Sequence, residues 1–553
     1  MTYNIHKRFL TVCIAIFTAG FFCSAAESLS NISFEDAGDE GALHWKNTGA
    51  GGVDAAFARD TASAHSGTAS MRITVPPTDK QSWPSAFQRI AVKEGETYIL
   101  EAYVKTADVT RGAYISGDCF DESGKRLSYT GTSLQAGTSD WKKYFVTVVV
   151  PPKATVLQFT MILFGAGTAW FDDVSMRRDE KAAQLAAELA KPLPAEWFKR
   201  AVVSDGNVAR IKRAFAKAAA GKVTVGVIGG SITQGASAST ADKRYAGHML
   251  AWWKRNFPAA ECTLINAGIG ATGSDYGSMR IQRDLLSKKP DFIVVEYAVN
   301  DGNTQERAES YEGVIRQIMA DPGKPGVLLM FMVNEAGGNA QEWESKIGTH
   351  YGIPMVSYRD LVWPELAAKR IVWRDISPDN IHPNDIGHAY AGKLIGEMLD
   401  RIKAMPDAAA DAAALPAPLL TDKFQYTMIA EADALTPAAN EGWTLDTTQA
   451  NKCYKSAVPG SVIEFDVTGD KLFLSYWVVK GPMGKAKITV DDGDPRVEDS
   501  WFDQTWGGYR RMIMISDGKP GKHRVRVEVL ADKNPKSTGN EFRLLMLGAA
   551  GVR

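Results

Sequence analysis

The stretch Val223-Thr-Val-Gly-Val-Ile-Gly-Gly-Ser-Ile-Thr233 decides the fold of the central part of this chain. It is a largely apolar run that ends at paired glycines followed by a serine. Similar apolar runs and helix-patterned stretches follow it in alternation, the runs at 264–266, 292–297, 327–333 and 354–357, the helix patterns for example at 245–256 and 389–402. Strands that stay apolar along their length and alternate with helices indicate a parallel sheet covered on both faces. We therefore predict a three-layer, doubly wound α/β domain over residues 201–403.

Two strand-rich regions flank this domain. Residues 27–178 contain short apolar runs between Gly, Asp and Ser turns, which predict a β-sandwich. Residues 421–553 hold strands with a period of two, as in 523–529, where three valines share one face, and predict a second sandwich. Helical spacing predicts a connecting helix over 179–200, and Ala/Pro-rich composition predicts a spacer over 404–420 with no core of its own. A chain of 553 residues is expected to be multidomain.

The N-terminus has the layout of a cleaved secretory signal. Lys7 and Arg8 precede an apolar run over 9–22, and small residues end it before Glu27. The run is shorter than the about 20 apolar residues that span a bilayer, which disfavours a membrane anchor. A lipid anchor on Cys23 is the minor alternative, because bulky phenylalanines precede that cysteine. We expect residues 1–26 to be removed and the protein to be secreted, periplasmic or extracellular, with no membrane attachment.

The composition excludes some function classes. A net charge of -1 with 23% charged residues offers no basic excess for nucleic acid, so we expect no nucleic-acid partner. Outside the signal, Cys119, Cys262 and Cys453 are widely separated, and no Cys/His cluster accompanies them. We therefore expect neither a disulfide framework nor a zinc site.

Three predicted strands end in residues that suit a catalytic site. Ser231 follows the glycine pair, Gly270 follows the second strand, and Asn300 follows the third. In doubly wound sheets, ligands bind at the carboxyl ends of the strands, so these residues are expected at one sheet edge. Taken singly, each also fits an ordinary feature: a helix-capping serine, a plain turn and an Asx turn.

A base and its orienting carboxylate are predicted near the end of the α/β region. Asp379 and His382 are three residues apart in a turn, a spacing that lets the two side chains meet. Asp385 and His388 repeat the spacing and compete for the role. Pro383 suits the first turn of a helix, which favours His382 at the mouth of that helix and His388 inside it.

In order and interval, these four segments resemble the consensus blocks of SGNH (GDSL-like) hydrolases, across residues 201–403. The resemblance implies a flavodoxin-like α/β fold and a serine esterase that needs no metal or other cofactor. It assigns a catalytic triad and an oxyanion hole, the triad being Ser231, Asp379 and His382, and the oxyanion donors Ser231, Gly270 and Asn300.

The sequence departs from the family pattern at two positions. Gly230 stands where the family has an aspartate, and Ala298 where it has a glycine. Neither position carries a reacting group, so the expected mechanism is kept. The departures concern the shape of the pocket and the placing of Ser231.

The N-terminal region resembles carbohydrate-binding jelly rolls at its ends, 31–36 and 170–174. Such modules often hold a structural calcium on acidic groups near their termini, which here points to Glu35 and to Asp173 or its neighbour Asp172. Ordinary surface turns are the alternative, because a calcium site needs six or more oxygen ligands.

Other candidate residues have plainer interpretations. His248 and His350 lie in helix-patterned stretches and are expected to be structural. Trp373 and Tyr245 fit either a sugar-binding cleft or buried packing. A metal site on His382, Asp385 and His388 lacks the one-face helical spacing of a His-x-x-x-His site.

The expected function is therefore acyl-ester hydrolysis on a carbohydrate. Flanking modules that bind a polymer raise the effective concentration of substrate at the catalytic site, which favours removal of acetyl groups from a polysaccharide such as a hemicellulose or pectin. Aromatic residues in 500–509 fit either a sugar contact or core packing. The alternatives are a lipase or long-chain acylhydrolase, and a catalytically inactive glycan-binding protein.

Overall fold

The chain divides into two compact units, Met1–Lys191 and Pro192–Arg553, in a computed structural model. The predicted signal, 1–26, lies outside the described residues, as do 181–190 of the predicted connecting helix and 407–413 of the predicted spacer. The structure describes residues 28–38, 41–49, 52–180, 191–406, 414–504 and 507–552.

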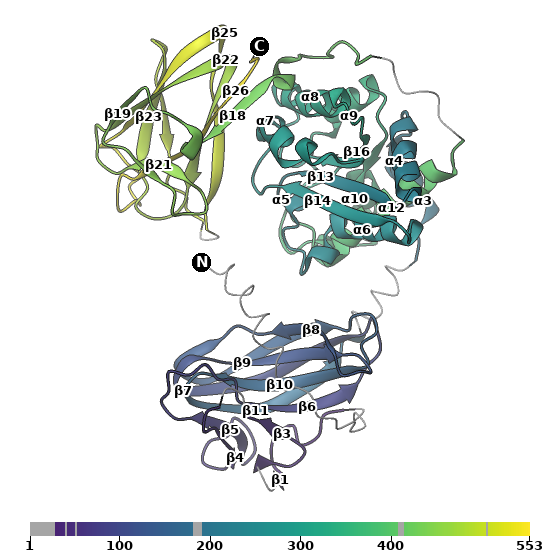
Figure 1. Ribbon diagram of the computed structural model, residues 1–553, viewed down its shortest axis with the longest axis vertical. Coiled ribbons are helices and arrows are strands. Elements are labelled where there is room, and N and C mark those ends of the chain that lie inside the picture. The colour runs from purple at the N-terminus through teal and green to yellow at the C-terminus, as the bar shows by residue number, and fades with distance from the viewer. Residues whose placement is uncertain are drawn as a thin grey trace. The chain divides into compact units, whose positions relative to one another are not determined.

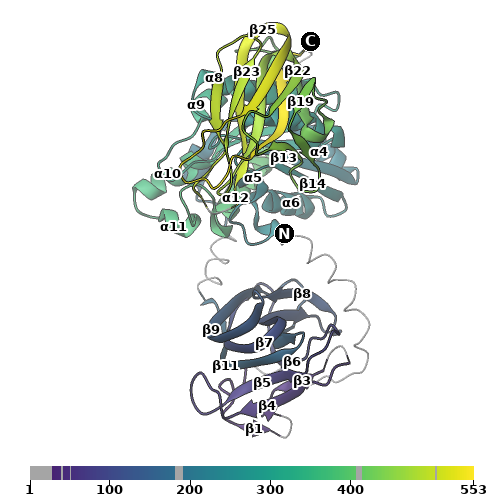
Figure 2. The ribbon, with the colours of Figure 1, turned by 90° about the vertical axis from the view of Figure 1, so that its left-hand side faces the viewer.

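The first unit is built of β-strands (Figure 1). Its larger sheet has the order β3-β6-β10-β7-β11-β5-β4, with β8 and β9 also paired to β7, and both views show β8 and β9 on the side away from β3, β4 and β5 (Figure 2). The strands are β1 (Ala37–Gly38), β2 (Gly41–Ala42), β3 (Lys46–Thr48), β4 (Ala56–Asp60), β5 (Ser70–Val75), β6 (Ser85–Ala91), β7 (Thr97–Phe120), β8 (Arg126–Gly131), β9 (Gln135–Val149), β10 (Val156–Phe164) and β11 (Gly167–Arg178).

The core of this unit follows the two-residue period of its strands. In β7, Leu100, Ala102 and Val104 are buried in the hydrophobic cluster, while the intervening Glu101 and Tyr103 are partly exposed. Alternation of this kind places one face of a strand on the core and the other toward solvent. The predicted strand-rich character of this region is confirmed.

The second unit contains a six-stranded sheet in the order β12-β17-β16-β15-β13-β14. The five strands from β17 to β14 pair in parallel, as predicted, whereas β12 is antiparallel to β17. The three-residue edge strand β12 was not among the predicted strands, and it pairs antiparallel, as edge strands of such sheets commonly do. The strands are β12 (Val202–Ser204), β13 (Lys222–Gly229), β14 (Glu261–Gly268), β15 (Phe292–Glu296), β16 (Gly326–Phe331) and β17 (Met355–Ser357).

Helices alternate with these strands along the chain. In Figure 1, α7, α8 and α9 lie above β13 and β14, and α6 lies below them. The helices are α3 (Ala195–Ala201), α4 (Ala209–Ala219), α5 (Ser231–Gln234), α6 (Tyr245–Asn256), α7 (Ser274–Asp284), α8 (Gln305–Ala320), α9 (Gln341–His350), α10 (Tyr358–Ala367), α11 (Trp373–Ile376) and α12 (Asp385–Ala404). Among the described residues, no helix is long and apolar enough to cross a membrane.

The strands of this sheet contribute to two hydrophobic clusters. Val227 and Val294 belong to the cluster that also holds residues of α4, α6 and α12. Their neighbours Ile228 and Val295 belong to the cluster that holds residues of α7, α8 and α9. Because successive residues of a strand point to opposite faces, apolar side chains are needed at every position, which explains the continuous apolar runs.

A second sheet, formed by the C-terminal strands, completes this unit and packs against the helices. Its order is β20-β21-β26-β22-β25-β23-β24, with β18 paired to β26 and β19 to β22. Its strands are β18 (Thr427–Glu431), β19 (Ala439–Glu441), β20 (Thr444–Asp446), β21 (Cys453–Ser456), β22 (Val462–Val478), β23 (Lys485–Val490), β24 (Arg496–Asp499), β25 (Tyr509–Val529) and β26 (Phe542–Ala550).

The contact between this sheet and α7 is partly apolar and partly ionic. Tyr276 and Met279 of α7 share a buried cluster with Phe473 and Met546 of the sheet. Arg283 of α7 lies 3.1 Å from a carboxylate oxygen of the β18 residue Glu431. The α/β region and the C-terminal sheet therefore form one compact unit.

The described part of the predicted spacer is docked on the helices. The buried carboxylate of Glu312 in α8 accepts hydrogen bonds from the backbone N–H groups of Leu420 at 2.8 Å and Thr421 at 2.9 Å. Leu420 also packs against the hydrophobic cluster of that helix layer. Composition predicted a segment without its own core, and residues 414–420 instead use the core of the α/β region.

Candidate active site

Ser231 stands at the carboxyl end of β13, as the first residue of the short helix α5. The preceding Gly230 has φ −87° and ψ −147°, and the N–H of Gln234 donates to the Gly230 carbonyl oxygen at 2.9 Å, which closes the first helical turn. The serine side chain is half-buried. This turn directs a serine hydroxyl toward the edge where the other parallel strands end.

His382 and Asp379 reach the same edge from the loop between α11 and α12. Nε2 of His382 lies 2.9 Å from Oγ of Ser231, and Nδ1 of His382 lies 2.8 Å from Oδ2 of Asp379. The other carboxylate oxygen, Oδ1, accepts the backbone N–H groups of Ile381 and His382, both at 2.7 Å. One ring nitrogen thus faces the carboxylate and the other faces the serine hydroxyl.

Hydrogen bonds hold the pKa of Asp379 low. Burial by itself raises the pKa, but the backbone and side-chain hydrogen bonds from His382, with the N–H of Ile381, outweigh burial and lower it. An ionised carboxylate at this position stabilises a positive charge on the imidazole ring.

The loop that carries this pair is fixed through the carbonyl oxygen of Asp379. Nε1 of Trp373 donates to this oxygen at 2.6 Å, the hydroxyl of Ser377 lies 2.8 Å from it, and the guanidinium of Arg374 also donates to it. The hydroxyl of Ser377 lies 2.7 Å from the carbonyl oxygen of His382 as well. Trp373 therefore supports the loop from within the core, being 8% exposed.

Gly270 and Asn300 border the serine turn. A methyl group built on Gly270 would lie 3.8 Å from Cβ of Ser231, which places this backbone beside the turn that carries the serine. A methyl group built on Gly230 would lie 2.1 Å from Oδ1 of Asn300, so the amide rests directly on the glycine. The structure thus brings together all five residues that the sequence singled out.

The two departures from the family pattern have different consequences. Gly230 provides room for the Asn300 amide, because no larger residue fits there with the amide in this place. Ala298 is fully buried in the hydrophobic cluster of α7, α8 and α9, and its carbonyl oxygen accepts the Ala340 N–H at 2.8 Å. The alanine methyl is therefore accommodated as core.

The competing pair lies elsewhere. Asp385 begins α12 and accepts the hydroxyl and the N–H of Ser239, at 2.6 and 2.8 Å. His388 is fully buried within α12, where Nε2 lies 3.2 Å from the carbonyl oxygen of Ala236. Burial lowers the pKa of His388 to about 4, which keeps the ring neutral.

The remaining side chains of interest make structural contacts. His248 lies in α6 and His350 in α9, as expected. Tyr245 is fully buried, and its hydroxyl lies 2.8 Å from that of Thr233. Of the two interpretations of Tyr245 and Trp373, buried packing is therefore the one that the structure favours over a sugar-binding cleft.

The proposed calcium ligands of the first unit bind protein groups instead. Oε1 of Glu35 accepts the Thr68 N–H at 2.9 Å, and Glu35 also lies 3.6 Å from Arg59. The Asp173 carboxylate lies 2.6 Å from both the His65 ring and the Ser66 hydroxyl. Within the part of the chain that the structure describes, no group of three or more His, Cys, Asp or Glu side chains suits a metal ion. The calcium prediction therefore finds no support at these residues.

Comparison with known proteins assigns the family. A model of the GDSL-like lipase/acylhydrolase family matches residues 227–390, and a model of a carbohydrate-binding domain matches residues 26–164. A two-domain esterase active on acetylated mannans, co-crystallised with mannopentaose, is 33% identical and aligns over 64% of this chain and 98% of its own, with a TM-score of 0.60. The chain belongs to the GDSL-like lipase/acylhydrolase family. It is a carboxylic ester hydrolase.

A second solved structure of a two-domain esterase with the same described activity gives the same result for this GDSL-like hydrolase. It is 33% identical, covers 64% of this chain and 99% of its own, and has a TM-score of 0.61. No curated protein matches the chain.

A small cavity opens beside Asn300 in this GDSL-like hydrolase. Its volume is about 170 Å³, and residues of α7 and of strand β25 in the C-terminal sheet line it. Most of the lining is polar: Ala271, Thr272, Gly273, Asp275, Tyr276, Asn300, Arg307, Arg510 and Met512. The cavity thus lies next to Asn300, the predicted oxyanion donor.

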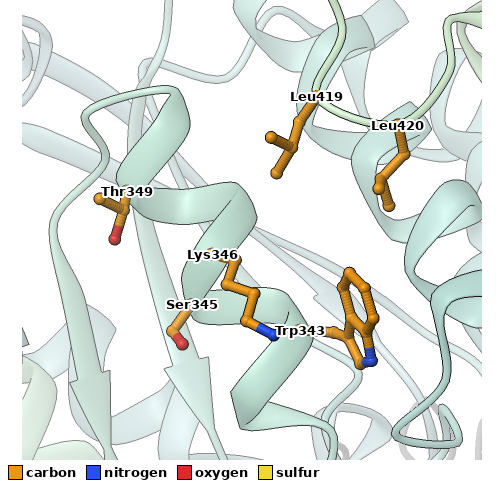
Figure 3. A pocket seen from close by; sticks show the side chains of 6 residues that line it. All are labelled: Trp343, Ser345, Lys346, Thr349, Leu419 and Leu420. Carbon is orange, nitrogen blue, oxygen red and sulfur yellow. The ribbon is translucent and has the colours of Figure 1, made fainter.

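A larger cavity, of about 400 Å³, lies on α9, and Ser231, Asp379 and His382 are not among the residues that line it (Figure 3). Trp343 and Lys346 of α9 line it opposite Leu419 and Leu420, and the Lys346 ammonium lies 4.3 Å from the centre of the Trp343 ring.

Buried acids behind the site were missed by the sequence interpretation. Glu296, the last residue of β15, is fully buried, and burial raises its pKa to about 8. Asp301, next to Asn300, is also buried, and its pKa is raised to about 7, first by burial and then by the charge of Asp275. An apolar run that ends in Glu gives a hint of this, but burial of the carboxyl becomes visible only in the fold.

Proposed function

We propose that this hydrolase is an exported serine esterase that removes acetyl groups from a polysaccharide. The observation that carries the proposal is the hydrogen-bonded line from Asp379 through His382 to Ser231, with distances of 2.8 and 2.9 Å. This is the geometry by which a base activates a serine and a carboxylate orients the base.

The proposed reaction begins with proton transfer from Ser231 to Nε2 of His382. Oγ then bonds to the acetyl carbonyl carbon, and the carbonyl π electrons move to its oxygen. As the intermediate collapses, the bond from the acetyl carbon to the sugar oxygen breaks, and His382 returns the proton to that oxygen. The products of this half are a free sugar hydroxyl and an acetyl-enzyme.

Water completes the cycle. His382 takes a proton from water, whose oxygen attacks the acetyl-enzyme, and the bond to Oγ then breaks as the proton returns to Ser231. Acetic acid leaves and gives its proton to solvent to become acetate, and the enzyme regains its first state. In both halves, the N–H groups of Ser231 and Gly270 and the amide of Asn300 are proposed to donate to the negatively charged oxygen.

The surroundings favour a carbohydrate ester over a long-chain lipid. The cavity beside Asn300 is small and carries the charged side chains of Asp275, Arg307 and Arg510, which do not suit an alkyl chain. The match of residues 26–164 to a carbohydrate-binding domain supports a polymeric sugar partner, as does the likeness to an esterase active on acetylated mannans.

We further propose a division of work along the chain. Residues 27–178 hold the polymer, the three-layer α/β region 201–403 carries out the chemistry, and 421–553 packs beside the catalytic edge. Residues 1–26 direct export, so the N-terminal sequence of the secreted protein is expected to start at Glu27.

The test is acetate release from acetylated mannan, xylan and pectin by the wild type and by Ser231→Ala. The proposal expects release from at least one polymer and its loss in the variant by a factor of about 10⁴ to 10⁶. A nitrophenyl ester series from acetate to decanoate tests the rival, because a preference for eight carbons or more contradicts an acetylesterase.

A further inference from the structure

The fully buried arginine of α7 touches all three strand ends that lead to the proposed oxyanion donors. Arg280 is 0% exposed. Its Nη1 donates to the carbonyl oxygen of Ala267 at 2.7 Å, and its Nη2 donates to the carbonyl oxygen of Gly229 and to the hydroxyl of Tyr297, both at 3.2 Å. No other role is assigned to this side chain by the proposed chemistry.

Each contact lies just before one donor in the chain. Gly229 ends β13 two residues before Ser231, and Ala267 in β14 is three residues before Gly270. Tyr297 follows β15 three residues before Asn300. One planar guanidinium therefore ties three separate loops to each other at their roots.

The surroundings of Arg280 suit this geometry. The carboxylate of Asp284, one helical turn later, lies 3.1 Å from Nη1 and balances the buried charge. Gly277 leaves space for the Tyr297 hydroxyl, because a methyl group built there would lie 2.3 Å from it. Guanidinium presents five donors in a fixed plane, whereas the lysine ammonium is a compact point charge on a flexible stem.

We propose that Arg280 is a positioning residue that sets the relative places of the three oxyanion donors. The inference rests on the proposed function, since it concerns the donors of that reaction. Donors stabilise a transition state only where the charge develops, and they must be held there before the reaction starts. Arg280 acts through the three strand ends and touches no reacting atom.

The test separates donor placement from fold stability. Arg280→Lys and Tyr297→Phe are compared with Arg283→Lys, whose parent side chain is on the same helix, 45% exposed, and paired with Asp284 and Glu431. For each variant, the kcat and KM for nitrophenyl acetate are measured per active site, with sites counted from the burst of nitrophenol. The affinity for a boronic acid, which forms a tetrahedral adduct on the serine, and the thermal midpoint are measured alongside.

The expected result is a loss in kcat with little change in KM. For Arg280→Lys we expect kcat per site to fall about 10²-fold, the loss typical of a misplacement by ~1 Å, and boronate affinity to fall by a similar factor. Tyr297→Phe removes one contact, and kcat is expected to fall about fivefold. Arg283→Lys is expected to stay within about twofold of the wild type.

Arg280→Lys would overturn the proposal if it keeps the wild-type kcat and boronate affinity per active site and has only fewer active sites or a lower thermal midpoint. That result would give Arg280 a purely structural role. If Arg280→Lys does not fold, Tyr297→Phe decides, and unchanged kcat and boronate affinity in that variant would overturn it. Ser231→Ala separates this outcome from failure of the proposed function. Activity that survives in Ser231→Ala contradicts the proposed function itself, whereas its loss there with normal Arg280→Lys contradicts only the role of Arg280.

Discussion

The two sides of the candidate site are built in different ways. The donor side, where β13, β14 and β15 end, is fixed from within the core by Arg280, which is fully buried. The acid–base side is the surface loop before α12, where the side chains of Asp379 and His382 are 44% and 27% exposed. One side is anchored by the sheet, and the other by hydrogen bonds within a loop.

This difference matches what each side has to do in the proposed reaction. The negative charge develops at one point, so the donors stabilise the transition state only if they are fixed in place beforehand. The imidazole must exchange protons with the serine, the sugar oxygen and water, and it needs access to solvent for the last of these. Substitutions on the two sides should therefore fail in different ways.

The largest effect is expected on the acid–base side, from Asp379→Asn. The amide no longer stabilises a charged imidazole and favours the wrong tautomer, so kcat is expected to fall about 10³- to 10⁴-fold. The measurement is steady-state hydrolysis of nitrophenyl acetate. Asp385→Asn is the control, because that carboxylate binds Ser239, and near-equal losses in the two variants would remove Asp379 from the proposed triad.

On the donor side, Asn300→Ala is expected to lower kcat about 10²- to 10³-fold, as removal of one oxyanion donor does in other serine hydrolases. KM should change little, because the amide acts in the transition state. Asn303→Ala is the matched control, since its amide lies 3.3 Å from a carboxylate oxygen of Glu342 on the surface. A rise in KM at constant kcat would instead make Asn300 a residue for ground-state binding.

A smaller effect on the same side tests the glycine that replaces the family aspartate. The methyl group of Gly230→Ala would displace the Asn300 amide, and we expect kcat to fall about 10- to 10²-fold. In the Asn300→Ala background the same substitution should add almost nothing, because the displaced donor is already absent. Full additivity in this double-mutant cycle would show that Gly230 acts independently of Asn300.

The smallest effect on catalysis is expected from Glu296→Gln, which tests the burial of the donor side through stability. Burial raises the pKa of Glu296 from 4.5 to about 8, so its contribution to stability is complete below pH 4.5 and is lost as the pH rises through 8. The ionisation of this single group is expected to lower the free energy of unfolding by about 5 kcal/mol across that window. The thermal midpoint of the wild type should fall from pH 5 to pH 8.5, and that of Glu296→Gln should fall less.

Glu342→Gln is the control for this pH series. Glu342 is exposed, and hydrogen bonds from Asn303 and Lys346 lower its pKa, so its substitution should leave the slope between pH 5 and 8.5 unchanged. Parallel curves for the wild type and Glu296→Gln would mean that Glu296 is not a buried neutral acid.

The sheet and the residues at its edge were predictable because both follow simple rules. Strands buried on two faces must be apolar throughout, and parallel strands end at one edge, so Ser231, Gly270 and Asn300 were expected to meet. The antiparallel β12 was not predictable, because three residues give no period to recognise. The docking of residues 414–420 was also hidden, since it depends on a carboxylate of α8 far away in the sequence.

The supports of the site could not be predicted from the sequence. Arg280 stands between Met279 and Ile281 in a helix, and the pattern does not reveal which carbonyl oxygens its guanidinium reaches. The need for a glycine at position 230 likewise depends on contact with Asn300, seventy residues later in the chain. Short-range patterns identify groups that carry chemistry, and long-range contacts decide how firmly they are held.

Covalent labelling of the serine tests the central claim most directly. A small fluorophosphonate is added to the wild type, His382→Ala and Ser231→Ala, and the adduct is located by peptide mass spectrometry while ester hydrolysis is followed. We predict one adduct, on Ser231, that forms in step with the loss of activity and is much slower in His382→Ala. Stoichiometric modification of Ser231 with full activity remaining, or an inactivating adduct on another residue, would contradict the proposed site.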